Sequence, residues 1–375
     1  MDKISELKRI LKQNFKWNKC RVDCFAKMLL SLFSVRTVNL SEIALSFASK
    51  ANTDSRYKRL QRFFRYFKID YNILAKWIFS LFASKEKVYV VVDRTNWFWG
   101  KTKINILTLG IAHEGIAIPL FWKLLSKAGN ATAKEHQEII KRFVDLFGRK
   151  CIAGVLGDRE FASGHLFKWL NKEKIPFFVR IKEGSVVKIR GKKFTSAKRL
   201  FKHLEIKQRN TYGMAVEISD ATVYLAGSRS ERGELMIVAT NQKTRNAVEI
   251  YLRRWEIETL FSCLKSRGFY FEATHLRHLA RIEKMMALLT VGLCWAHKIG
   301  EWRSEIKPIR WTKHRHCIRP QNSYFRLGLD LLREILLNPY KRRAKITKYI
   351  NLLIPKIKPP APPPAIHDLI FGGIL

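Results

Sequence analysis

The pattern of hydrophobic and polar positions changes along the chain. Through residues 1–85 the apolar residues recur at helical spacing, which predicts a helical region. From Lys87 short apolar runs begin, and the first of them, Val88–Val92, is typical of a strand covered on both faces. Residues 184–240 alternate or run apolar between turn residues, which predicts a mainly β region. Helical spacing then returns and lasts to about residue 353.

The predicted elements between residues 88 and 181 come in an informative order. Three strands, a helix, a strand, a helix and a strand follow one another over Val88–Val92, Ile104–Ala112, Ile116–Phe121, Lys134–Phe147, Cys151–Leu156, Gly164–Glu173 and Pro176–Ile181. This is the succession of the ribonuclease-H-like fold. We therefore expect an α/β fold with a ribonuclease-H-like core, a β-rich insertion, a helical N-terminal region and a helical C-terminal region.

The stretch 251–269, YLRRWEIETLFSCLKSRGF, is predicted to form one long helix. At roughly 100° per residue, Tyr251, Arg254, Glu258 and Lys265 fall within about 60° of one another and share a face. This face is either a solvated row of salt bridges or part of a site. The other side of the helix carries Glu256 and, as expected packing residues, Leu252, Trp255 and Ile257.

The chain is strongly basic, with 71 Lys and Arg against 31 Asp and Glu and a formal net charge of +40. Such a charge destabilises a compact state unless a partner neutralises it, so a polyanion is the expected partner. An anionic membrane is the less favoured alternative, because the longest nearly apolar run, Met285–Ala296, is too short to span a bilayer.

Six scattered cysteines predict reduced thiols in a cytosolic protein, and their spacing does not match a zinc site. The N-terminus carries charges among its apolar positions and lacks a small-residue cleavage site, so we do not expect a signal peptide. These features together favour a cytoplasmic location.

A basic helix is predicted at Arg56–Phe67, after a short helix that begins with a capping sequence at Asn39. A short helix, a turn and a basic helix are similar to a helix-turn-helix DNA reader. The alternative is an amphipathic helix whose arginines are merely solvated. The charge of the whole chain favours DNA contact, and the candidate residues are Arg56, Arg59 and Arg62.

Three carboxylates are candidates for catalysis. Asp93 and Asp158 each follow an inner strand, and ligands gather beyond the carboxyl ends of such strands. Together with Glu258 they would offer oxygen ligands to Mg²⁺ or Mn²⁺, and two such ions about 4 Å apart can stabilise an in-line phosphoryl displacement. Either aspartate could instead be a turn former. Glu160 is an alternative to Asp158.

At these positions the sequence resembles the bacterial DDE transposases of insertion sequences that carry a Tyr-Arg-Glu-Lys signature. The signature has fixed spacing and is matched in full by Tyr251, Arg254, Glu258 and Lys265. The motifs around Asp93 and Asp158 are also typical of that family. The resemblance covers about residues 85–300, and the N-terminal region more loosely.

The resemblance implies a cut-and-paste transposase in which Asp93, Asp158 and Glu258 hold two Mg²⁺ or Mn²⁺ ions. Tyr251, Arg254 and Lys265 would contact phosphates of the transposon end. A metal-activated water would release a 3′-hydroxyl at that end, and the hydroxyl would attack target DNA. Relatives can stack an extruded base on a tryptophan of the inserted β region, whereas this sequence has no tryptophan between Trp169 and Trp255.

The implied partner is double-stranded DNA, as transposon ends and as target. Joining two ends requires that they be held together, so we expect a homodimer on DNA, in the bacterial cytoplasm and associated with the nucleoid. The chain is expected to divide into a helical DNA-binding region (1–85), the first part of the catalytic core (86–183), a β-rich insertion (184–240), the end of the core with the Glu258 helix (241–300), a helical C-terminal region and candidate dimerisation surface (301–353), and a Pro-rich tail (354–375).

Two other classes of protein remain open from the sequence. A DNA-binding regulator or inactive element product would bind end DNA and not cut it. A structure-specific nuclease of the same fold would cut DNA and leave no joined product.

Overall fold

The structure is a computed structural model that describes residues 4–83, 87–127, 129–189, 194–314, 317–338 and 342–355. The chain forms two compact units. We call one the helical unit (Met1–Ala83, Asn96–Asn105 and Thr259–Pro359) and the other the sheet unit (Ser84–Thr95, Ile106–Glu258 and Pro360–Leu375). Most of the predicted Pro-rich tail lies outside the described residues.

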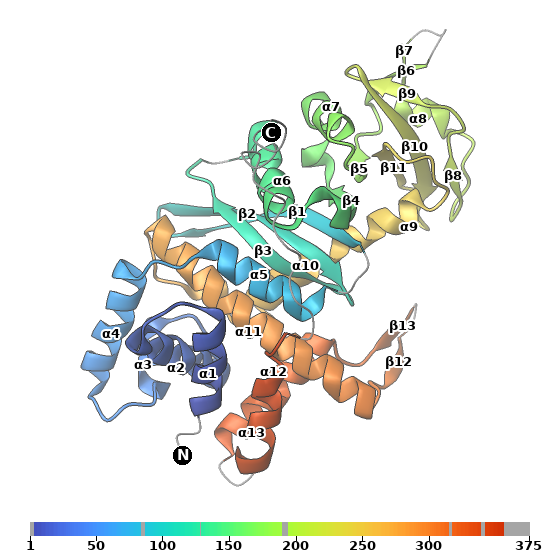
Figure 1. The fold of residues 1–375 in the computed structure, drawn as a ribbon. Coiled ribbons are helices and arrows are strands. Elements are labelled where there is room, and N and C mark those ends of the chain that lie inside the picture. Colours follow the sequence, from blue (N-terminus) through green and yellow to red (C-terminus); the bar gives the residue numbers. More distant parts are fainter. Residues whose placement is uncertain are drawn as a thin grey trace, which may run out of the picture. The chain divides into compact units, whose positions relative to one another are not determined.

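A single mixed sheet of eleven strands dominates the sheet unit (Figure 1). Its strand order is β3-β2-β1-β4-β5-β11-β10-β9-β6-β7, and β8 pairs with β10. The strands are β1 (Val88–Trp99), β2 (Thr102–His113), β3 (Ile116–Leu124), β4 (Ile152–Gly157), β5 (Phe177–Ile181), β6 (Val186–Ile189), β7 (Phe194–Ser196), β8 (Arg209–Thr211), β9 (Val216–Ile218), β10 (Ala221–Arg229) and β11 (Leu235–Thr240).

The first five strands confirm the predicted ribonuclease-H-like arrangement. β1 pairs in parallel with β4, β4 pairs in parallel with β5, and β2 pairs antiparallel with β3. The crossovers between the parallel strands contain α6 (Ala133–Phe147) and α7 (Gly164–Lys172). Helix α6 begins at a capping box formed by Thr132 and Glu135, which satisfies backbone donors of its first turn. Its apolar side packs inward through Ile139, Ile140, Phe143 and Phe147.

The β-rich region is continuous with the core sheet. Strand β11 pairs antiparallel with β5, so residues 186–240 extend the sheet at its β5 edge. The sequence predicted a block that interrupts the core, and its mainly β character is confirmed. The block also contains a short helix, α8 (Ala197–Leu200). Alternation of apolar and polar residues within a strand does not show which strand pairs with it. That the β-rich region and the core share one sheet was therefore not predictable from the sequence.

The predicted single helix over residues 251–269 is wrong in two respects. The chain forms α9 (Ala247–Leu252), a 3₁₀ turn (Arg253–Trp255) and α10 (Glu256–Leu264). Residues 252, 253 and 256 keep right-handed helical dihedrals, so the helical path continues through the tighter turn. The helix ends before Arg267, because Gly268 packs against the Cys263 carbonyl where a Cβ would collide.

Helices build the other unit and confirm the helical prediction for both ends of the chain. They are α1 (Ser5–Asn14), α2 (Lys19–Val35), α3 (Leu40–Ser46), α4 (Thr53–Tyr66), α5 (Tyr71–Phe82), α11 (Leu279–Ile306), α12 (Tyr324–Leu337) and α13 (Arg342–Asn351). Asn39 and Asn52 cap α3 and α4 by accepting backbone N–H groups. A hairpin of β12 (Trp311–His314) and β13 (Cys317–Pro320) was not predicted.

Helices α11 and α12 pack with their backbones in close approach. A Cβ at Gly328 would collide with the Ala296 carbonyl, and one at Gly300 would collide with the Tyr324 backbone. The indole of Trp295, fully buried on α11, donates a hydrogen bond to the Tyr349 carbonyl at 2.7 Å. Glycine at these two positions thus allows the close approach of α11 and α12.

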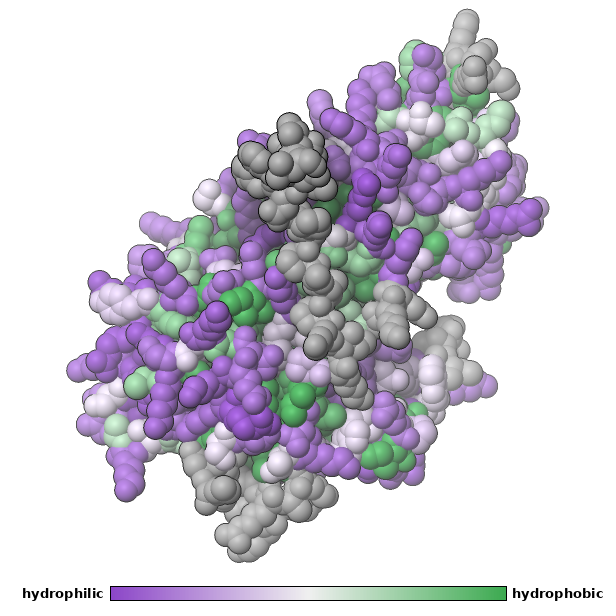
Figure 2. Space-filling view, viewed as in Figure 1, coloured by the Kyte–Doolittle hydropathy of each residue, from purple (hydrophilic) through white to green (hydrophobic). Residues whose placement is uncertain are grey.

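Hydrophilic side chains cover most of the face seen in Figure 2, as the excess of Lys and Arg leads one to expect. Within the described residues, no single helix is long and apolar enough to cross a membrane, while the bent pair α2 and α3 meets those criteria by length and composition.

Candidate active site

Two aspartates of the sheet unit are brought together by strand register. Val92 on β1 pairs with Gly157 on the parallel strand β4. Asp93 and Asp158 are the next residues along these two strands. Neighbouring strands are about 4.8 Å apart, so the two side chains start from adjacent positions. Each carboxylate accepts the backbone N–H of the residue that follows it, at 2.7 Å for Asp93 and 2.6 Å for Asp158.

Asp93 does not stand at the end of its strand, contrary to the sequence prediction. Strand β1 runs on to Trp99, and only its ladder with β4 ends at Val92. The polar run after Val92 reads as a strand end, yet the chain stays extended because β2 lies beside β1 in the sheet. At Asp93 the strand therefore still lies beside β2, but it no longer pairs with β4.

Arg254 links two of the three candidate carboxylates. Its guanidinium donates to Glu258 Oε1 at 2.6 Å and to Asp93 Oδ2 at 3.3 Å. The arginine side chain is only 6% exposed, whereas Glu258 is 59% exposed. A buried arginine that pairs with two carboxylates fixes their relative positions.

The pKa of Asp93 is raised to about 6, chiefly because the carboxyl is buried. The Arg94 N–H and the Arg254 charge lower this pKa, while the nearby charges of Asp158 and Glu160 raise it. The same neighbourhood acts on Arg254, whose pKa is raised by Tyr251, Glu258, Asp93 and Asp158 although burial opposes the shift. The candidate site is thus a concentration of negative charge that one buried cation partly offsets.

The four residues of the Tyr-Arg-Glu-Lys signature do not all fall in one unit. Tyr251 is fully buried in the sheet unit, with the Arg254 guanidinium 5.8 Å from the centre of its ring. Lys265 belongs to the helical unit, where its ammonium pairs with Glu272 at 2.9 Å and lies 5.2 Å from the Trp97 ring centre. The structure therefore brings Tyr251, Arg254 and Glu258 together with the two aspartates. Lys265 belongs to the helical unit and is not part of this group.

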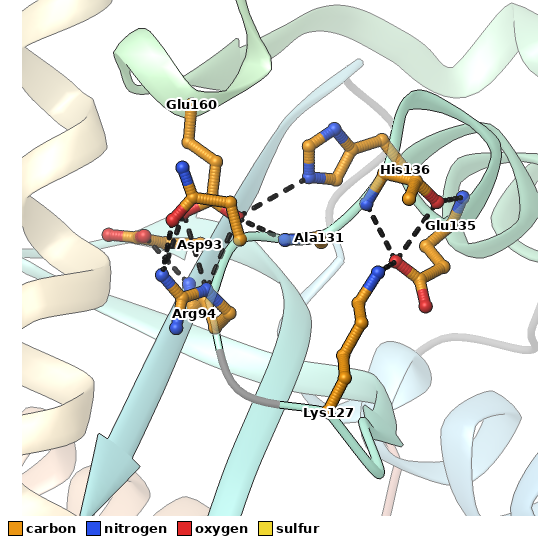
Figure 3. A network of polar contacts seen from close by, with 9 residues as sticks. Asp93, Arg94, Lys127, Ala131, Glu135, His136 and Glu160 are labelled. Atoms are coloured by element: carbon orange, nitrogen blue, oxygen red, sulfur yellow. Dashed lines mark hydrogen bonds and ion pairs between the residues drawn. The ribbon is translucent and has the colours of Figure 1, made fainter.

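Glu160, the alternative to Asp158, is committed to other partners (Figure 3). Arg94 donates to both of its oxygens at 3.1–3.3 Å, and the Ala131 N–H donates at 2.7 Å. The His136 ring stacks on Phe161, and its Nε2 lies 3.9 Å from Glu160. Burial opposes the effect of these contacts, which nevertheless lower the pKa of Glu160 to about 2. Glu160 is ionised and fully engaged, unlike the exposed Glu258.

We expect Glu160→Gln to leave metal-dependent DNA cleavage within a few-fold of wild type while lowering the free energy of unfolding by about 2 kcal/mol. The reason is that the partly buried Arg94 charge would lose its carboxylate partner. Single-turnover cleavage and thermal denaturation measure the two effects. Loss of cleavage with unchanged stability would instead make Glu160 one of the catalytic carboxylates.

Two of the three predicted DNA contacts on α4 have structural partners. Arg56 donates to the carbonyls of Ala51 and Ser49 at 2.7 Å, which ties down the turn between α3 and α4. Arg59 pairs with Asp23 at 3.0 Å. Arg62 is exposed, and within the described part of the chain its side chain donates only to the Lys58 carbonyl one turn earlier. Their role toward DNA stays a prediction, and the first two also hold the fold together.

Asp23 collects three cations, and its pKa is lowered to about 2 by Lys8, Lys27 and Arg59 against the effect of burial. A folded pKa below the ordinary 3.8 stabilises the protein above pH 4, and this stabilisation is lost as the pH falls through about 2. We expect Asp23→Asn to cost about 2 kcal/mol at neutral pH and almost nothing near pH 2. Denaturant unfolding across this range measures it. Asp145→Asn, in an exposed pair with Lys141, is the control and should cost little.

Trp255 is exposed, although the sequence predicted that it packs. Its side chain is 58% exposed and lines a pocket of about 350 Å³ together with Leu252, Arg180, Arg209 and Met236. At roughly 100° per residue Trp255 lies only about 60° from Glu258, so its assignment to the packing side of the helix was wrong. The pocket lies between the segment Leu252–Trp255 and the β-rich part of the sheet.

A ribonuclease-H-like sheet with one aspartate on β1, a second directly after β4 and a glutamate on α10 is the arrangement typical of phosphoryl-transfer enzymes of the DDE type. Residues 90–295 match the family model described as the transposase DDE domain. This match spans more than half of the chain, so the chain belongs to that family and is a DDE transposase. The transposase class expected from the sequence is confirmed.

Among solved structures, the chain is similar to a piggyBac transposase in a cryo-EM structure of a synaptic complex with hairpin DNA. The TM-score is 0.48 and the sequence identity 10%, over 91% of this chain and 77% of that chain. A search of curated protein sequences found no match.

Proposed function

We propose that this transposase belongs to the group with the Tyr-Arg-Glu-Lys signature and that Asp93, Asp158 and Glu258 are its catalytic carboxylates. The observation that carries the proposal is the buried Arg254, which pairs with Asp93 and Glu258 while Asp158 follows the neighbouring strand. A solvated row of surface charges would not bury its arginine to 6% exposure.

The donor set fits hard divalent cations. It consists of carboxylate oxygens alone, and both Asp93 and Asp158 are only partly buried, so solvent and substrate can reach them. Asp93, Asp158 and Glu258 would hold Mg²⁺ or Mn²⁺, two ions in our proposal. When bound, these ions supply the Lewis-acid stabilisation of the attacking and leaving oxygens in phosphoryl transfer.

The reaction is a pair of phosphoryl transfers. Water attacks the phosphorus at the transposon end, the bond to the 3′-oxygen breaks, and the element keeps a 3′-hydroxyl while the flank keeps the phosphate. That hydroxyl then attacks a target phosphodiester, forms a new bond to phosphorus and displaces the target 3′-oxygen. We assign contacts with phosphates of the transposon end to Arg254, Tyr251 and Lys265, and this assignment requires that DNA binding expose Tyr251, which is fully buried in the structure.

We further propose that two copies act together on DNA, because both ends must be held while they are joined, and that residues 301–353 contribute to this dimer. The predicted bacterial cytoplasmic location, with the nucleoid, is part of the same proposal. Five described cysteines are free thiols, as a reducing compartment requires. A measured mass of one chain on one end during joining would contradict the dimer.

The decisive functional experiment is a strand-transfer assay with the DNA ends that flank this reading frame. In Mg²⁺ or Mn²⁺ the protein should cut the ends and produce joined target DNA. Binding without cutting would identify a regulator or inactive product, and cutting without joining a structure-specific nuclease.

A further inference from the structure

A basic pocket lies in the helical unit, where α3 and α4 meet the segment before α11. It is a pocket of about 220 Å³, and the polar residues that matter here are Asn39, Tyr57, Gln61, His275, Arg277 and Arg281. We call it the α4–α11 pocket. All of its residues belong to one compact unit.

The lining of the α4–α11 pocket is cationic and contains no carboxylate. Among the described residues, neither Arg277 nor Arg281 forms a salt bridge, whereas other arginines of this unit, such as Arg59 and Arg326, are paired with aspartates. Two unpaired guanidiniums beside one cavity favour an anionic ligand. The lack of carboxylates argues against a site for Ca²⁺ or Mg²⁺.

The walls of the pocket are held in place by contacts within the helical unit. Lys284 of α11 donates to the Phe64 carbonyl at the end of α4 at 2.8 Å. His275 stacks on Trp99 with ring centres 4.4 Å apart, and the Asn39 side chain caps α3. Because these contacts already hold the pocket residues in place, ligand binding costs little conformational entropy.

Size and surroundings point to a polymer and not to a small molecule. The volume is below the range of about 300–1,000 Å³ that is usual for small-molecule sites, yet it accommodates a single phosphate group. From the pocket, the exposed side of α4 continues through Lys58, Arg62 and Arg65. A row of cations that begins in a phosphate-sized pocket fits the backbone of duplex DNA.

We propose that the α4–α11 pocket binds a backbone phosphate of duplex DNA and that the duplex runs along the exposed side of α4. This inference rests on the proposed function, since a transposase must hold DNA ends. It places the phosphate contact on Arg277 and Arg281, because Arg56 and Arg59 are engaged in the fold. The contact positions the duplex and carries no base preference.

The test compares two double variants that remove the same charge from the same unit. Arg277→Ala with Arg281→Ala removes the pocket cations. Arg9→Ala with Arg326→Ala removes two exposed arginines that are paired with Glu6 and Asp330. Binding of a labelled, mixed-sequence duplex is measured without divalent metal over a range of salt concentrations, and thermal denaturation checks that both variants fold.

We expect the pocket variant to bind duplex DNA more weakly and to lower the slope of log K against log salt by about 1, while the control variant keeps the wild-type slope. An unchanged slope in the folded pocket variant, or an equal loss in the control, would overturn the inference. So would inorganic phosphate binding that depends on Arg277 and Arg281 while DNA binding does not. If the wild-type protein bound no duplex at all, the proposed function would fail as well.

Discussion

Replacing Glu258 with Gln is expected to reduce metal-dependent cleavage of the transposon end by at least about a thousand-fold. The amide keeps the size of the side chain but removes its charge, and with it both the hydrogen-bonded ion pair to Arg254 and the ability to hold a divalent cation. Binding of end DNA should persist, since the phosphate contacts are made by other residues. Single-turnover cleavage and DNA affinity, measured on the same preparations, separate the two effects.

The matched control for this variant is Glu256→Gln on the same helix. Glu256 lies two positions before Glu258. It pairs with Arg253 at 3.4 Å, whereas Glu258 pairs with Arg254. Its substitution should leave cleavage within a few-fold of wild type. Equal activity losses in the two variants would mean that any charge change in α10 is harmful, and Glu258 would lose its assigned role.

Replacing Arg254 with Ala is expected to lower the rate of cleavage about a hundred-fold at saturating DNA. The substitution removes the buried cation that holds Asp93 and Glu258 together, and it also removes a phosphate contact. Arg254→Lys keeps the charge but cannot form both bonds through one planar group, so it should recover only part of the rate.

A purely structural role for Arg254 makes a different prediction. In that case the alanine variant would lose stability and keep its rate once folded, and the lysine variant would behave like wild type. Thermal denaturation together with single-turnover rates for the two variants distinguishes these outcomes. A wild-type rate for folded Arg254→Ala would contradict the proposed role.

Local sequence rules predicted the parts of the site that depend on neighbouring positions. Arg254 and Glu258 lie one helical turn apart, so their ion pair follows from helical spacing. Asp93 follows the last β1 residue paired with β4, and Asp158 follows β4 itself, so their adjacency follows from the predicted strand order. The core strands and helices were predictable for the same reason.

Features that depend on distant contacts were not predictable. The Arg94 and Glu160 pair joins residues 66 positions apart and depends on the backbone of Ala131, which no local pattern encodes. The inward direction of Arg56 is set by the carbonyls of a turn that the sequence does not specify.

The central claim is that three carboxylates form one metal-binding site, and the position of manganese in crystals of the protein with end DNA tests it most directly. Anomalous scattering should place Mn²⁺ among the carboxylates of Asp93, Asp158 and Glu258, and the signal should fall in the Glu258→Gln variant. Manganese bound elsewhere, or an unchanged signal in that variant, would contradict the claim.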